Sequence, residues 1–97
     1  MKIYLYLCGD GSCPIELDSE NISFLYLGGG KPYLVVYNPV PVIEELHKKG
    51  YWWKAECDDN GMSTKIQLEE YEWSISFNWE TAKRYSRWEE ETEIGEN

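Results

Sequence analysis

The sequence predicts an α+β fold: a mainly antiparallel sheet of about five to six strands, with two helices near residues 39–49 and 79–91. Short runs rich in β-branched and aromatic residues recur along the chain, and most of them are joined by short turns that contain Gly or Asn. Only two segments have the spacing of an amphipathic helix. Because short turns favour antiparallel neighbours, the expected class is α+β.

The length of 97 residues predicts one globular domain over residues 1–91, followed by an acidic, mobile tail over residues 92–97. An apolar content of 42% is too high for a disordered chain. No apolar run approaches the ~20 residues that span a bilayer, and the N-terminus does not resemble a signal peptide. We therefore expect a cytoplasmic protein that does not bind membranes.

The first half of the chain predicts four strands and a helix. Residues 3–8 are apolar on both faces, as in a central strand, and residues 15–17 return beside them. Two further runs, 22–27 and 33–37, form a hairpin around a glycine-rich loop. Asn38, followed by two prolines, caps the first helix, and Gly50 ends it.

The second half predicts a hairpin, a further strand and the second helix. Asn60-Gly61 between two alternating runs indicates a tight type I′ turn. Asn78 caps the second helix, and three acids at its far end oppose the helix dipole, so this end should fray. The residues with the parity expected of the core are Trp53, Trp73, Ile75 and Phe77. Ala55 and Cys57 share the face of Trp53, and Ile66 and Leu68 alternate with polar residues on the partner strand.

Motifs that could carry chemistry are weak. His47, the only histidine, lies beside two lysines late in the first helix, where a cation is favourable in itself. The odd count of three cysteines, Cys8, Cys13 and Cys57, indicates free thiols in a reducing cytoplasm, and their spacing does not suit zinc. A bridge between Cys8 and Cys13 across the glycine-containing loop is the alternative. Gly28 to Lys31 is followed by proline rather than by a helix, so it is not a phosphate loop. We expect no catalytic residue, no cofactor and no metal, and hence no enzyme.

The charge of the chain is concentrated toward its C-terminal end. The formal net charge is −9, and the segment from Glu69 onward holds nine acids against three bases, Lys83, Arg84 and Arg87. Large aromatic residues lie among these acids. Carboxylates with Trp and Tyr can form a surface for a basic partner, because Trp and Tyr are enriched at the energetic centres of interfaces. The predicted partner-binding residues are Glu69, Glu70, Glu72, Trp52, Trp79, Trp88, Glu89, Glu90 and Glu91.

Two alternatives remain open for this segment. The acids could serve only for solubility, because net charge bears on association and solubility rather than on fold. Trp79 and Trp88 share a stripe with Ala82 and Tyr85, so these tryptophans could instead form a second small core under the helix.

We expect a small acidic, non-enzymatic inhibitor that binds a basic nucleic-acid-handling protein, with its carboxylates in place of phosphates. Its size and charge are similar in kind to those of small viral anti-defence proteins, including anti-CRISPR proteins and other nucleic-acid mimics, although no motif assigns it to a family. One alternative is an immunity protein that neutralises a basic bacterial toxin. A second is an acidic structural or interaction module without an inhibitory role.

An acidic surface also disfavours direct binding of nucleic acid. The oligomeric state is left open.

Overall fold

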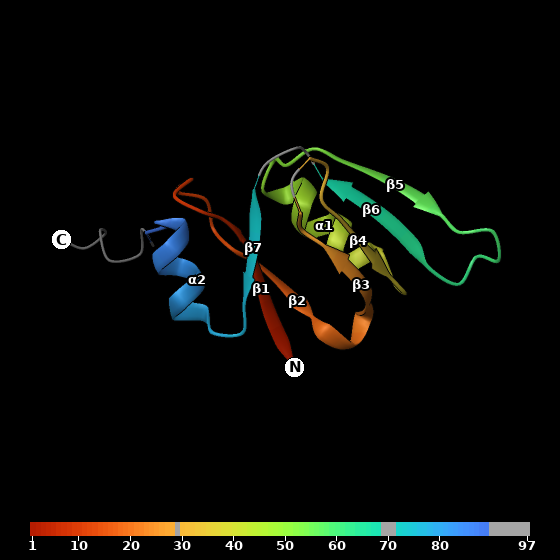
Figure 1. The fold of residues 1–97 in the computed structure, drawn as a ribbon, viewed down its shortest axis with the longest axis horizontal. Coiled ribbons are helices and arrows are strands. Elements are labelled where there is room, and N and C mark those ends of the chain that lie inside the picture. Colours follow the sequence, from red (N-terminus) through yellow and green to blue (C-terminus); the bar gives the residue numbers. More distant parts are fainter. Residues whose placement is uncertain (29, 69–71, 90–97) are drawn as a thin grey trace.

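A computed structural model describes residues 1–28, 30–68 and 72–89, and it shows an α+β fold (Figure 1). The predicted class is confirmed, but the arrangement differs: the described residues form two antiparallel sheets, one of three and one of four strands. The elements in chain order are β1 (Lys2–Leu7), β2 (Ile15–Asp18), the 3-10 turn η1 (Ser19–Asn21), β3 (Ile22–Tyr26), β4 (Tyr33–Val36), α1 (Val40–Lys48), β5 (Trp53–Cys57), β6 (Thr64–Leu68), β7 (Trp73–Ser76) and α2 (Trp79–Ser86).

The three-stranded sheet has the order β2-β1-β7, with β1 in the centre as its apolar faces predicted. Leu5 lies opposite Ile15 on one side and Ile75 on the other. The side chains of Ile3, Leu5 and Leu7 are buried in the main core. Tyr4 and Tyr6 point to the opposite face of the sheet, as alternation along a strand requires.

Helix α2 covers that opposite face. The ring centroid of Trp79 lies 5.4 Å from that of Tyr4, and the ring centroid of Tyr85 lies 6.4 Å from that of Tyr6. Ala82, between these two rings in the helix, is fully buried. The predicted cap is confirmed, because Asn78 Oδ1 accepts a hydrogen bond from the backbone N–H of Thr81 at 3.0 Å.

The predicted end of this helix was wrong. Helix α2 stops at Ser86, because Arg87 adopts a left-handed conformation with φ of 65°. The N–H groups of Arg87 and Trp88 then both donate to the carbonyl of Lys83, at 3.0 and 3.2 Å, which closes the helix end. Residues 90 and 91, which the sequence placed in the helix, lie outside the described residues, as does the predicted tail at 92–97.

The four-stranded sheet has the order β3-β4-β6-β5. The inner face of this sheet, helix α1 and the inner face of the three-stranded sheet share one core. Figure 1 shows α2 on one side of β1 and β7, with α1 and the larger sheet on the other. The buried side chains of this core include Leu34, Val36, Val42, Leu46, Ile66 and Leu68.

Helix α1 agrees with the prediction to within a residue at each end. The predicted cap differs by one residue, because Pro39 is the N-cap and has no side-chain capping bond. Asn38 Oδ1 instead accepts a hydrogen bond from Val40 N at 3.2 Å, just before the helix. Gly50, with φ of 79°, is the predicted stop, and its N–H donates to the carbonyl of His47 at 3.1 Å. Among the described residues, neither helix is long and apolar enough to cross a lipid bilayer.

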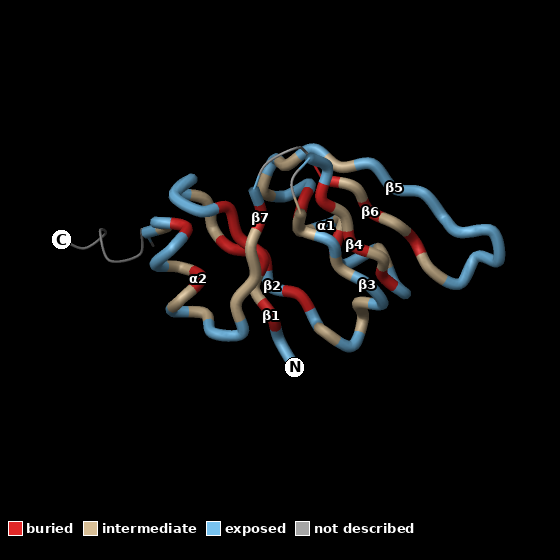
Figure 2. Tube along the Cα trace, in the orientation of Figure 1, coloured by how far each residue is buried: buried red, intermediate tan, exposed pale blue. Residues whose placement is uncertain are grey.

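The hairpin of β5 and β6 extends beyond the core, and Figure 2 shows its outer part as exposed. Two side chains that share the face of Trp53 are therefore not part of the core. Ala55 and Cys57 lie on the inner side by alternation but are exposed, because none of the described elements packs against this end of the hairpin. Outside this hairpin, the prediction that Phe77 faces the core is wrong. Phe77 is 66% exposed, because β7 ends at Ser76 and the chain turns toward α2.

The turn of this hairpin also differs from the predicted type I′ turn. Cys57 pairs with Thr64, so residues 58–63 form a longer loop. Gly61 has a positive φ of 71°, but Asn60 does not have a positive φ, which type I′ requires. The carboxylate of Asp58 organises the loop instead, accepting hydrogen bonds from Met62 N and Ser63 Oγ, both at 3.0 Å.

Candidate functional site

Only part of the predicted acidic site lies within the described residues. Glu72 and Glu89 are described, and both are exposed. Glu69, Glu70, Glu90 and Glu91 lie outside the described residues. The described stretch from Trp79 to Glu89 contains two acids against the three bases Lys83, Arg84 and Arg87.

The three predicted tryptophans differ in their surroundings. Trp79 and Trp88 are partly buried, and their ring centroids lie 5.8 Å apart in an edge-to-face arrangement. Trp79 also contacts Tyr4, so these rings form a small cluster beneath α2, as one of the two alternatives anticipated. Trp52 is 52% exposed.

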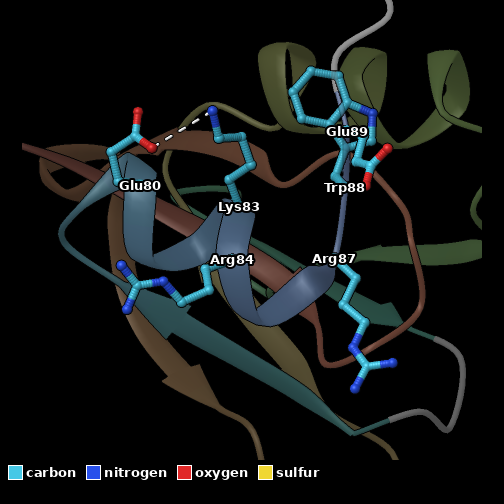
Figure 3. Close-up of a pocket in the computed structure, with 6 residues that line it drawn as sticks. All are labelled: Glu80, Lys83, Arg84, Arg87, Trp88 and Glu89. Atoms are coloured by element: carbon cyan, nitrogen blue, oxygen red, sulfur yellow. Dashed lines mark ion pairs between the residues drawn. The ribbon is translucent and has the colours of Figure 1, made fainter.

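A hollow of about 350 Å³ lies along α2 and its end (Figure 3). Lys83 Nζ forms an ion pair with Glu80 at 3.5 Å. Figure 3 shows the side chains of Arg84 and Arg87 pointing away from one another. Because these charged groups diverge, the hollow does not form a convergent binding or catalytic site. Its lining residues are Glu80, Lys83, Arg84, Arg87, Trp88 and Glu89.

A second surface, on the four-stranded sheet, was missed by the sequence reasoning. Leu34 and Val36 of β4 point into the core, so Tyr33 and Val35 point outward. Pairing between β3 and β4 sets Phe24 opposite Val35 and Tyr26 opposite Tyr33. These four side chains, Phe24, Tyr26, Tyr33 and Val35, therefore lie on one side of the sheet, and we call them the aromatic face.

The rings of the aromatic face are close together and open to solvent. The Tyr33 ring centroid lies 5.9 Å from that of Phe24 and 5.6 Å from that of Tyr26. Phe24 is 52% exposed and Tyr26 is 44% exposed. On the neighbouring strand β6, Lys65 places its Nζ 4.4 Å from the Tyr33 ring centroid, in a cation–π contact.

A β-bulge explains why the sequence did not indicate this face. The register between β3 and β4 shifts between Ile22 and Phe24, so strict alternation along β3 is broken. Without the bulge, Phe24 would share a face with Ile22. A usable signal was present in β4, where Tyr33 and Val35 alternate with Leu34 and Val36, but nothing in that strand shows which side is covered.

An acidic hollow of about 350 Å³ adjoins the aromatic face on the hairpin side. Val35 belongs to both, Lys65 also lines the hollow, and so do the carboxylates of Glu56, Asp58 and Asp59. Desolvation raises the pKa of Asp58, but hydrogen bonds from the Ser63 hydroxyl and the backbone N–H of Met62 favour the ionised form, so the pKa of Asp58 lies below its ordinary value. Asp58 is therefore a stable negative charge at neutral pH.

Other chemical groups do not gather into a site in the described part of the chain. His47 is exposed in the last turn of α1, and Cys8, Cys13 and Cys57 are free thiols. Within residues 1–28, 30–68 and 72–89, no three His, Cys, Asp or Glu side chains are grouped so that they could hold a metal ion.

Comparison of this chain with protein-family models, with curated proteins and with solved structures finds no match.

Proposed function

We propose that this protein is a small, non-enzymatic inhibitor that binds a basic nucleic-acid-handling protein, of the viral anti-defence type. The observation that supports binding is the aromatic face. A folded monomer normally buries such rings, and contiguous exposed apolar patches mark interaction sites. Exposed Phe and Tyr on a rigid sheet lose little conformational entropy when a partner covers them, so they suit an interface.

The charge of the molecule supports the choice of a basic partner. With a net charge of −9, the protein attracts cationic surfaces and repels phosphate. Glu56 and Asp59 are exposed on the projecting hairpin, where a partner's basic groove can reach them. In this proposal they take the place of phosphate groups, while the aromatic face anchors the contact.

The same surfaces would also serve an immunity protein that neutralises a basic bacterial toxin. The difference between the two functions is the identity of the partner: a host defence protein for the first and a cognate toxin for the second. A module whose acids only confer solubility would have no basic partner.

The experiment is capture of partners by the immobilised protein from host lysate, washed at low and at high salt, followed by an assay of the captured partner. We expect a basic protein that is retained at low salt and released at high salt, because the screening length between exposed charges falls from about 10 Å at 0.1 M salt to about 3 Å at 1 M. We also expect the captured partner to lose nucleic-acid binding when the protein is added. A partner that binds its nucleic acid equally well with and without the protein would contradict inhibition.

A further inference from the structure

We propose that the aromatic face and the adjoining acidic hollow together bind an arginine-rich extended segment of the partner, with one guanidinium over the Phe24 and Tyr26 rings and the next cation among the hollow's carboxylates. This inference rests on the proposed function, because it identifies the surface and the chemistry by which the basic partner would be recognised.

The face already holds one cation of its own. Lys65 Nζ lies 4.4 Å from the Tyr33 ring centroid, which shows that a positive group is accommodated against this layer of rings. Phe24 and Tyr26 are about half exposed, and no cation of the described residues lies over them. Their ring faces carry the same negative quadrupole that attracts Lys65, so they are available to a cation from another molecule.

The position of Lys65 also leaves a carboxylate available. Glu56 lies directly opposite Lys65 in the β5–β6 register. No ion pair joins the two residues, since Lys65 extends toward Tyr33 instead. Among the described residues Glu56 and Asp59 form no ion pair, while Asp58 uses its oxygens within its own loop. The hollow therefore presents two unpaired carboxylates. Glu56 lies on the same side of the sheet as Phe24, with β4 and β6 between their strands.

The arrangement favours arginine over the other occupants of an aromatic surface. A guanidinium stacks on aromatic rings and also donates hydrogen bonds to carboxylates, so it can use both halves of the surface. Single-stranded nucleic acid would stack on the rings, but its phosphates would meet Glu56 and Asp59. A second copy of this chain would bring the same carboxylates and the same net charge of −9 toward its partner.

The test is titration of the 97-residue chain with a synthetic nine-residue peptide of alternating arginine and serine, monitored by calorimetry and by NMR. The test variant is F24L/Y26L, which keeps apolar side chains on the strand but removes the ring quadrupoles. The control is F77L, which changes a ring that is 66% exposed outside this face. We expect F24L/Y26L to weaken peptide binding about tenfold, as two exposed cation–π contacts predict. We expect F77L to bind as the wild type does.

A second variant, E56Q/D59N, tests the hollow. We expect it to weaken peptide binding and to flatten the salt dependence of binding, whereas F24L/Y26L should leave that salt dependence unchanged. Unchanged chemical shifts of the buried Ile66 methyl groups would show that both variants fold.

Several outcomes would overturn the inference. One is that F24L/Y26L binds the peptide as tightly as the wild type does. Another is that F77L loses as much affinity for the peptide as F24L/Y26L does. Tighter binding of an oligothymidylate than of the peptide would assign the face to nucleic acid. Concentration-dependent shifts of Phe24 and Tyr26 without peptide would assign it to a second copy.

If F24L/Y26L loses the peptide but still captures and inhibits the basic partner, this contact is wrong while the proposed function stands. If the wild type captures no basic partner, the proposed function is wrong.

Discussion

Asp58 shows how one carboxylate determines a local structure that its neighbours in sequence only suggest. Its side chain accepts hydrogen bonds from Met62 N and Ser63 Oγ, and its own carbonyl accepts one from Gly61 N at 3.1 Å. The loop of the β5–β6 hairpin is thus closed around an aspartate. Asn-Gly, the strongest hairpin signal in the sequence, does not form the turn by itself.

We predict a pH dependence that follows from the lowered pKa of Asp58. The pKa of Asp58 is lower in the folded state than in the unfolded state, so its ionised carboxylate stabilises the fold. This contribution is complete above the ordinary pKa of about 3.9 and is lost as the pH falls through the folded pKa. Replacing Asp58 with Asn should lower the free energy of unfolding at pH 7, and the difference from wild type should shrink in acid. Urea unfolding at several pH values measures this. D59N is the matched control, and an equal effect in D59N would contradict the assignment.

Arg87 is the only described residue other than glycine with a positive φ, at 65°. A side chain in this conformation crowds the following carbonyl, whereas glycine does not. We predict that Arg87→Gly stabilises the fold by about 0.5–1 kcal/mol, after allowance for the greater backbone entropy of glycine in the unfolded chain. Thermal unfolding checks this, with Arg84→Gly as the control. Arg84 lies inside α2, so glycine there should destabilise by about 1 kcal/mol.

At the scale of elements, the β5–β6 hairpin depends on one backbone conformation. Gly61 has φ of 71°, and a Cβ at this position would meet no atom within 4 Å. We predict that Gly61→Val destabilises the fold by about 1 kcal/mol or more, because a β-branched residue resists positive φ even where space is open. The control is Met62→Val, in a residue that is 68% exposed and does not have positive φ. Equal melting temperatures of G61V and wild type would show that the loop does not require this conformation.

Helix α2 is attached to the molecule by backbone hydrogen bonds from Gly9 N to Tyr85 O and from Gly11 N to Ser86 O, and also by contacts between rings. Trp79 contacts both Tyr4 and Trp88, whereas Trp52 is 52% exposed. We predict that Trp79→Ala lowers the free energy of unfolding by about 2 kcal/mol or more, and that Trp52→Ala changes it by less than about 0.5 kcal/mol. Chemical denaturation measures both variants. If Trp79→Ala left stability intact, Trp79 would belong to an interface, as the sequence first suggested, and not to a core beneath α2.

At the scale of the whole molecule, charge is unevenly distributed. The described residues contain twelve acids and nine bases, so two thirds of the net charge of −9 belongs to residues 69–70 and 90–97. The described body is thus only mildly acidic, and long-range attraction depends strongly on these other acids. The aromatic face, by contrast, acts only at contact.

We predict that these two groups of residues affect binding kinetics differently. Reversing Glu69, Glu70 and Glu72 to Lys should slow association with the captured partner and flatten its salt dependence, because complementary charge mainly speeds encounter. Truncating Trp52 or Trp88, if either is interfacial, should raise the dissociation rate by an amount equivalent to about 2 kcal/mol. Surface plasmon resonance at two salt concentrations separates these effects. If the charge reversals do not change the association rate at low salt, these acids serve only for solubility.

Much of the local structure follows from the sequence because its causes are local. Asn78 begins α2, and Gly50 ends α1, through contacts within a single turn of the chain. The candidate site was less predictable. The acids and Trp52 were identified from composition and spacing, but the aromatic face was hidden by the bulge near Phe24.

The sequence by itself determined the α+β class, the existence of both helices, the central position of β1 and the side chains that share a face along most strands. Only the tertiary structure decided that the strands divide into two sheets, that α2 covers Tyr4 and Tyr6, and that Phe24 and Tyr26 stay uncovered. The physical reason is that alternation specifies which residues point the same way. Whether that side is buried depends on elements far away in the chain, whose packing no local pattern records.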